Sequence, residues 1–137
     1  MEVRDGMNRQ VVTVAPGHTL REATRRMVDR GVGAAVVVDP DGAGPGIVTE
    51  RDVLRALGSG RDPDVELVAD NHVDDVAYAS PDWSLEHAAA EMVARSLRHI
   101  VVLEGAEAVG VLSMRDIVRC WTSDGAACEL PPVALVG

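Results

Sequence analysis

The sequence predicts an α+β fold made of two tandem copies of one β-α-β-β-α unit, packed by pseudo-two-fold symmetry through their sheets. The chain contains an internal repeat, and each copy carries the same succession of strand and helix patterns. A unit of about sixty residues with one sheet and two amphipathic helices leaves an apolar sheet face uncovered. Two such units packed face to face would cover it.

The repeat becomes visible when the sequence is compared with itself. An offset of 65 residues carries Pro16 onto Pro81, and after one residue is lost in a turn an offset of 64 carries Gly46 onto Gly110. Further matched pairs are Leu20 and Leu85, Ala23 and Ala88, Met27 and Met92, Val36 and Val101, Asp52 and Asp116, and Arg55 and Arg119. The chain is therefore two copies of one unit.

Each copy shows the same local patterns. Thr19 and Glu22 have the spacing of a capping box that opens a helix, and Gly31 stands where a helix usually ends. The apolar run 34–38 is typical of a strand covered on both faces. The elements expected in the first copy are strands at 11–14, 34–38 and 47–48, with helices at 19–30 and 49–57. Those expected in the second are strands at 76–79, 99–103 and 108–112, with helices at 85–95 and 114–121.

The repeat also divides the chain into segments. We expect the first repeat at residues 1–58 and the second at 68–121, joined by a polar linker at 59–67 whose acidic residues are solvated. The remaining stretch, 122–137, is expected to form a tail, loose or docked on a partner.

Charge excludes several classes of partner. The 137 residues carry a net charge of −9, which argues against binding of duplex DNA or an anionic membrane. Every basic residue is Arg, whose planar fork suits carboxylates and phosphates. The longest apolar run, 31–38, is well short of the ~20 residues of a membrane span, and the first residues lack the apolar stretch of a secretory signal. We therefore expect a cytoplasmic protein with neither nucleic acid nor membrane as partner.

Residues that could carry chemistry are few. Cys120 and Cys128 have no metal-ligand spacing, and we expect both to be free thiols. The four histidines show no spacing typical of zinc ligands. No paired general acid and base, metal cluster or activated nucleophile is evident. The sequence thus predicts a protein that is not an enzyme and requires no cofactor.

A short motif ends the sheet of each copy, Gly46-Ile-Val-Thr-Glu-Arg-Asp52 in the first and Gly110-Val-Leu-Ser-Met-Arg-Asp116 in the second. Both resemble the Gly-apolar-apolar-Thr/Ser-x-x-Asp signature of paired CBS domains, also called Bateman modules. The stretch 97–103 is similar to the basic lead into that family's second strand. The resemblance covers residues 3–121, and two such motifs at matching places in a repeat make it specific.

The resemblance implies a regulatory sensor module that binds an adenosine-containing ligand in clefts between its repeats and does no chemistry on it. The ligand class is AMP, ADP, ATP, NAD or S-adenosylmethionine, with AMP or ATP favoured. Family members often pair into a flat homodimer, so the resemblance implies a homodimer here and a downstream protein whose identity the sequence does not give.

The same resemblance implies roles for particular residues. Thr49 and Ser113 would contact ribose or phosphate, and Asp52 and Asp116 the ribose hydroxyls. The remaining candidates are Arg98, His99 and Arg115 near phosphates, and Val11, Val12, Val76 and Ala77 beside adenine. The positions also make physical sense, because a helix N-terminus favours an anion and a carboxylate has two oxygens for two vicinal hydroxyls.

Each assignment has a plainer alternative. Thr-x-x-Asp and Ser-x-x-Asp are also capping boxes that stabilise a helix by about 1 kcal/mol, and Arg51 and Arg115 equally fit solvated helix positions. The first copy has Gly33-Ala34 where the second has Arg98-His99, so we expect at most one strong site. The alternative function is a ligand-free scaffold that uses the same helices only to dimerise.

Overall fold

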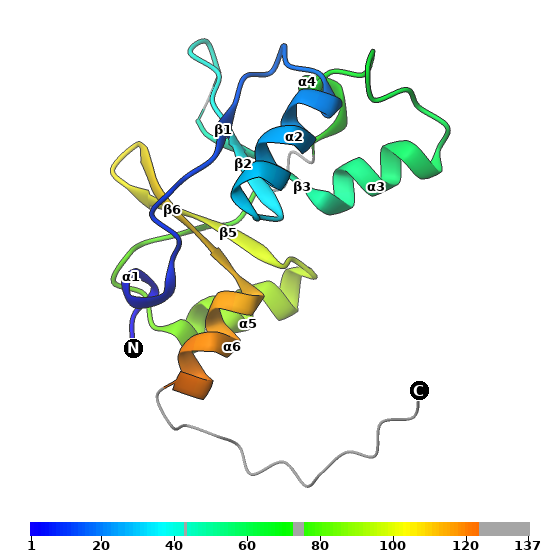
Figure 1. The fold of residues 1–137 in the computed structure, drawn as a ribbon. Coiled ribbons are helices and arrows are strands. Elements are labelled where there is room, and N and C mark those ends of the chain that lie inside the picture. Colours follow the sequence, from blue (N-terminus) through cyan, green and yellow to red (C-terminus); the bar gives the residue numbers. More distant parts are fainter. Residues whose placement is uncertain (43, 73–75, 124–137) are drawn as a thin grey trace, which may run out of the picture.

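The computed structural model describes residues 1–42, 44–72 and 76–123 (Figure 1). Two layered halves, each a three-stranded sheet with its helices, lie one above the other. The first repeat contains α1 (Val3–Gly6), β1 (Thr13–Val14), α2 (Leu20–Arg30), β2 (Ala34–Val37), β3 (Gly46–Thr49) and α3 (Glu50–Gly58). The second contains α4 (Val68–Asn71), β4 (Tyr78–Ala79), α5 (Leu85–Arg95), β5 (His99–Glu104), β6 (Glu107–Ser113) and α6 (Met114–Ser123).

The two sheets have the same topology. In each, the middle strand pairs parallel with the first strand and antiparallel with the third, giving the orders β1-β2-β3 and β4-β5-β6. The predicted α+β fold of two β-α-β-β-α repeats is confirmed. Thr19 accepts a hydrogen bond from the Glu22 amide at 3.2 Å, and Gly31 ends α2 in the left-handed conformation. The sequence pattern had predicted both helix boundaries.

Burial on both faces of the middle strands holds the halves together. Along β2, Ala35 and Val37 pack against the helices of the first repeat, whereas Ala34 and Val36 point to the other sheet. Val101 of β5 meets them there. Successive side chains of a strand point to opposite faces, so one continuous apolar run serves two hydrophobic clusters.

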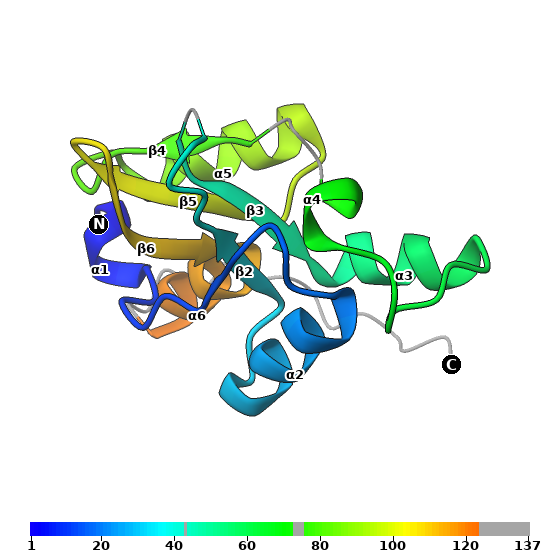
Figure 2. The same ribbon diagram turned by 90° about the horizontal axis from the view of Figure 1, so that it is seen from above.

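The two short helices α1 and α4, which the sequence did not predict, each pack against the opposite repeat (Figures 1 and 2). Val3 of α1 is fully buried in the core of the second repeat, where its amide donates to the Trp83 carbonyl at 2.8 Å. Val68 of α4 is fully buried in the core of the first repeat. The sequence repeats and the packed halves therefore do not coincide.

The segment expected to be a solvated linker is attached to the first repeat. The amides of Leu20 and Arg21 donate to the carbonyls of Glu66 and Pro63 at 2.9 and 3.0 Å. Arg21 also forms an exposed ion pair with Asp64 at 2.6 Å. These contacts fix the route that brings α4 against α2.

Three details differ from expectation or lie outside the description. The first strands are shorter than predicted, because only two residues of each pair with the middle strand. The residues just before them, Val12 and Ala77, each accept one backbone hydrogen bond from that strand. Helix α6 runs to Ser123, and the rest of the expected tail lies outside the described residues. Cys120 is a buried free thiol; Cys128 is not among the described residues.

Truncating Val3 to Ala should lower the free energy of unfolding by about 2 kcal/mol, because two methyl groups leave a closed core of the opposite repeat. Urea unfolding monitored by circular dichroism measures the change. Val65→Ala is the matched control, since Val65 is 70% exposed, and it should stay within about 0.5 kcal/mol of the parent chain. Equal effects of the two substitutions would contradict the exchanged arrangement.

Candidate functional site

In both repeats the last strand runs directly into a helix. Thr49 ends β3 and is the N-cap of α3, and Ser113 ends β6 before α6. The sheet register places Ala34 opposite Thr49 and His99 opposite Ser113. The N-terminal end of each middle strand, called its lip below, therefore lies beside a helix N-terminus.

The two signature carboxylates are buried inside capping boxes. Asp52 is 3% exposed and Asp116 is 8% exposed. The Oδ2 atom of each accepts a hydrogen bond from the backbone amide of its N-cap residue, Thr49 or Ser113, at 2.8 Å. The plainer interpretation as capping boxes is thus correct for both motifs. The carboxylates can still accept further hydrogen bonds, because each oxygen has two lone pairs.

Each carboxylate also faces a cleft between the repeats. The larger cleft has a volume of about 900 Å³ and includes Asp116, and the smaller, of about 240 Å³, includes Asp52. Small-molecule sites commonly span roughly 300–1,000 Å³, so the larger cleft is of ligand size and the smaller one falls just below that range. Neither carboxylate points into bulk water away from the interface between the repeats.

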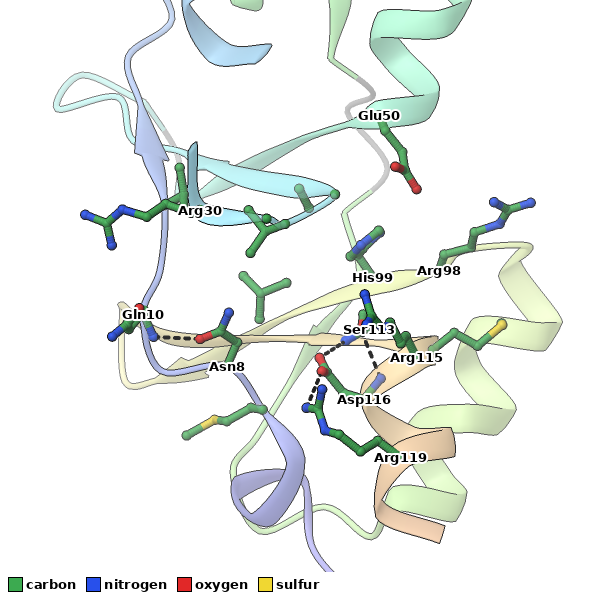
Figure 3. A pocket seen from close by; sticks show the side chains of 18 of the residues that line it. Asn8, Gln10, Arg30, Glu50, Arg98, His99, Ser113, Arg115, Asp116 and Arg119 are labelled. Carbon is green, nitrogen blue, oxygen red and sulfur yellow. Dashed lines mark hydrogen bonds and ion pairs between the residues drawn. The ribbon is translucent and has the colours of Figure 1, made fainter. Parts of the chain in front are cut away.

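The larger cleft is rich in arginine although the chain is acidic (Figure 3). It is lined from three directions, by the segment before β1, by the α2–β2 turn and by the β6–α6 junction. Glu50 and Asp116 are its acidic residues. Its arginines are Arg9, Arg30, Arg98, Arg115 and Arg119. Five arginines against two acidic residues give the lining of this cleft an excess of positive charge, which suits an anion.

Arg119 also fixes the orientation of Asp116. One guanidinium nitrogen donates to Asp116 Oδ1 at 2.6 Å, while the Asp116 amide donates to Ser113 Oγ at 3.0 Å (Figure 3). The equivalent pair in the first repeat is looser, with 3.8 Å between Arg55 and Asp52 Oδ1. The carboxylate of the larger cleft is the better held of the two.

The smaller cleft lies between α3 and the α5–β5 turn. Arg51 spans the repeats there, donating to the Ser96 carbonyl at 3.2 Å. Arg51, Arg55, Arg95 and Arg98 are its arginines, against Asp52 and Glu50. This cleft is therefore also positive, by four arginines to two acids.

Three side chains line both clefts, namely Glu50, Arg98 and His99. Figure 3 shows Glu50 extending from the start of α3 toward the β5 lip that carries Arg98 and His99. Burial lowers the pKa of His99; the carboxylates of Glu50 and Asp116 oppose this shift, and the Arg98 charge adds to it. His99 thus lies within the electrostatic reach of residues from both repeats.

The sequence-predicted polar residues fall into two groups. Ser113, Arg115 and Asp116 line the larger cleft, whereas Thr49 and Asp52 line the smaller one. Arg98 and His99 join both. The structure brings every one of them to the interface between the repeats; a contact of any of them with a ligand stays a prediction.

The residues expected beside adenine divide differently. Val12 lines the larger cleft and Ala77 the smaller. Val11 and Val76 instead pack into the cluster between the two sheets. In an extended segment, neighbouring side chains point to opposite sides, so only one residue of each pair can face a cleft. Val11 and Val76 do not line either cleft, and their contact with adenine stays a prediction.

Sequence reasoning missed several lining residues. Arg9 and Gln10 reach the larger cleft because the N-terminal segment crosses to the second repeat, and no local pattern reveals such a crossing. Glu50 was overlooked inside the motif itself. Arg119 could have been found, since an Arg three residues after Asp116 on a helix is correctly spaced for an ion pair.

Comparison with known proteins identifies the family. The family model for the CBS domain matches residues 2–59 and 69–122. The chain belongs to the CBS-domain family. The chain is 33% identical over 134 residues to the CBS domain-containing protein YhcV of Bacillus subtilis, and the match covers 96% of this chain and 94% of YhcV. Two further curated relatives are longer, and the chain spans 62% and 44% of them.

Solved structures share the fold. The CBS domain pair of protein MJ0100, solved in complex with 5′-methylthioadenosine and S-adenosyl-L-methionine, superposes with a TM-score of 0.82 at 21% identity over 90% of this chain and 98% of that one. A hexameric CBS-CP12 protein from bloom-forming cyanobacteria gives a TM-score of 0.84 at 23% identity, over 98% and 78% of the two chains. At these identities the likeness establishes the fold alone.

The described helices are too short or too polar to cross a membrane. Within residues 1–42, 44–72 and 76–123 there is also no group of three or more His, Cys, Asp or Glu side chains that could hold a metal ion.

The buried His99 gives stability a pH dependence. Because its folded pKa is lowered from 6.5, the unfolded chain takes up a proton first, and stability due to neutral His99 is lost as pH falls below about 6.5. His99→Gln should therefore lose less free energy of unfolding between pH 7.5 and 5.5 than the parent chain. Urea titrations at the two pH values test this, and identical losses in both proteins would refute it.

Proposed function

We propose that this CBS-domain pair is a regulatory module that binds an adenosine-containing ligand in the larger cleft between its repeats. The observation that carries the proposal is the buried carboxylate of Asp116 at a helix entrance, facing a cleft of about 900 Å³ with five arginines. A carboxylate suits vicinal hydroxyls, and arginines suit phosphate. Their combination in one cleft favours a phosphorylated nucleoside, with AMP or ATP foremost.

The family supports the adenosine component. The CBS pair of MJ0100 was solved with two adenosine compounds, and this chain has the same fold. The surroundings of Asp116 support the ribose contact: Oδ2 receives the Ser113 amide and Oδ1 receives Arg119. Each oxygen keeps a lone pair for a hydroxyl of the ligand.

The difference between the clefts supports one dominant site. The smaller cleft has about a quarter of the volume of the larger one, 240 against 900 Å³. Its carboxylate, Asp52, has a weaker cationic partner in Arg55 at 3.8 Å. We propose that ligand fills the larger cleft first.

We further propose that the module binds its ligand without transforming it. Ser113 Oγ accepts the Asp116 amide at 3.0 Å, so this hydroxyl serves as a cap at the start of α6. The clefts combine arginines with capped carboxylates, an arrangement that suits binding. A change in the packing of the two repeats on ligand binding would pass the signal to a downstream protein.

A thermal-shift screen with AMP, ATP, NAD and S-adenosylmethionine tests the proposal. A ligand at 100 times its Kd stabilises the folded state by about 2.7 kcal/mol, which is readily measured. Asp116→Ala should weaken the active ligand by about 100-fold in calorimetry, because charged hydrogen bonds contribute roughly 1.5–3 kcal/mol each.

The control for this substitution is Ser84→Ala, which removes the N-cap of α5, where Ser84 Oγ accepts the His87 amide at 3.0 Å. It should cost about 1 kcal/mol of stability and leave affinity unchanged. Unchanged AMP affinity in Asp116→Ala would contradict the ribose role. No shift with any of the four compounds would favour the ligand-free scaffold.

We also propose that the module pairs with a second copy through its outer helices. Leu54 of α3 is 71% exposed and Val118 of α6 is 53% exposed, and the two occupy equivalent positions in the repeat. Leu57 and Trp121 form a second exposed equivalent pair. Apolar side chains repeated on two helices make a pseudo-symmetric surface that a two-fold axis can join to itself.

Val118→Glu should convert such a dimer into a 14.5 kDa monomer, because the charge would be buried unpaired at the interface. Sedimentation velocity measures the mass. Val65→Glu, at an exposed site in the segment 59–67 that connects the repeats, should leave the dimer intact. A monomeric parent chain, or a larger assembly like the cyanobacterial hexamer that Val118→Glu does not change, would contradict the proposal.

A further inference from the structure

The two clefts share one wall. Of the described residues, Glu50, Arg98 and His99 are those that line both the larger and the smaller cleft. Arg98 is exposed and His99 half-buried at the lip of β5. A phosphate entering from either side would meet the same two basic side chains.

The first repeat supplies no second pair of this kind. Its equivalent positions are Gly33 and Ala34, and a Cβ added at Gly33 would come 3.1 Å from the Glu50 carboxylate carbon. The Glu50 amide donates to the Gly33 carbonyl at 2.9 Å. An acidic side chain therefore occupies the space that a second Arg–His pair would need, and the wall offers one such pair where exact symmetry would give two.

Of the described arginines, Arg98 is the one that lines both clefts. Arg51 is held by the Ser96 carbonyl at 3.2 Å, and Arg119 by Asp116 at 2.6 Å. Arg115 lines the larger cleft but not the smaller. Two phosphates that each contact Arg98 would lie within about one Debye length, ~8 Å at physiological ionic strength, so their repulsion is poorly screened.

We propose that the two clefts compete for the Arg98–His99 pair, so that a phosphorylated ligand in one cleft lowers the affinity of the other. The inference rests on the proposed function, and it adds a regulation of that site. An adenosine ligand without phosphate places no charge at the wall and escapes the competition. The module therefore responds differently to charged and uncharged adenosine compounds.

Calorimetry with AMP and adenosine, on variants that leave one cleft functional, tests this proposal. Asp52→Asn isolates the larger cleft and Asp116→Asn the smaller, and Asn keeps an oxygen to accept the N-cap amide. Adding Arg98→Ala to either variant should lower the affinity for AMP by about fivefold or more, as expected for the loss of one charge-assisted contact. The matched Arg115→Ala should weaken AMP only in Asp52→Asn.

In the parent chain, the affinity for the second AMP should be at least about tenfold lower than the affinity of the same cleft in the variant in which it alone is functional. For adenosine the two values should agree within about threefold. The proposal is also supported if the smaller cleft shows no measurable AMP binding in the parent chain but binds AMP in Asp116→Asn.

Other outcomes overturn it. The competition is wrong if Arg98→Ala affects one cleft only, if Asp116→Asn binds no AMP, or if two AMP molecules bind the parent chain as tightly as the single clefts do. In each of these cases the proposed function still holds. If the parent chain binds neither AMP nor adenosine nor any other compound of the screen, both the function and the competition fail.

Discussion

The burial of two apolar sheet faces against each other is the constraint on which the rest of this structure depends. Val36 and Val101 lie fully buried in the shared layer, and the small side chain of Ala34 lies beside them. Close packing of the sheets brings the lips of β2 and β5 together. The clefts lie where the strands end and the helices begin, so their shape follows from the packing of the core.

Much of this arrangement could be predicted from the sequence because it is encoded locally and twice. The helix caps at Thr19 and Ser84, the buried run of β2 and the strand-to-helix motifs all carry short-range signals. Repetition then strengthened each weak signal. The positions of Asp52 and Asp116 at the interface followed from the same motifs.

The remainder depended on contacts between distant segments. The crossing of α1 to the second repeat is decided by which hydrophobic core Val3 completes, and no spacing in the sequence records that choice. The crossing in turn brings Arg9 and Gln10 to the larger cleft. The sequence could not show that Val11 and Val76 pack between the sheets, because the face of an extended residue depends on its register within the sheet.

The exchanged short helices also bear on how the chain folds. Each hydrophobic core takes buried side chains from the other half of the polypeptide, Val3 and Met7 in one core and Val68 in the other. Neither half can bury its own apolar surface before the other is present. The pair is thus a single cooperative unit, and an excised repeat would expose a hollow where its neighbour's valine belongs.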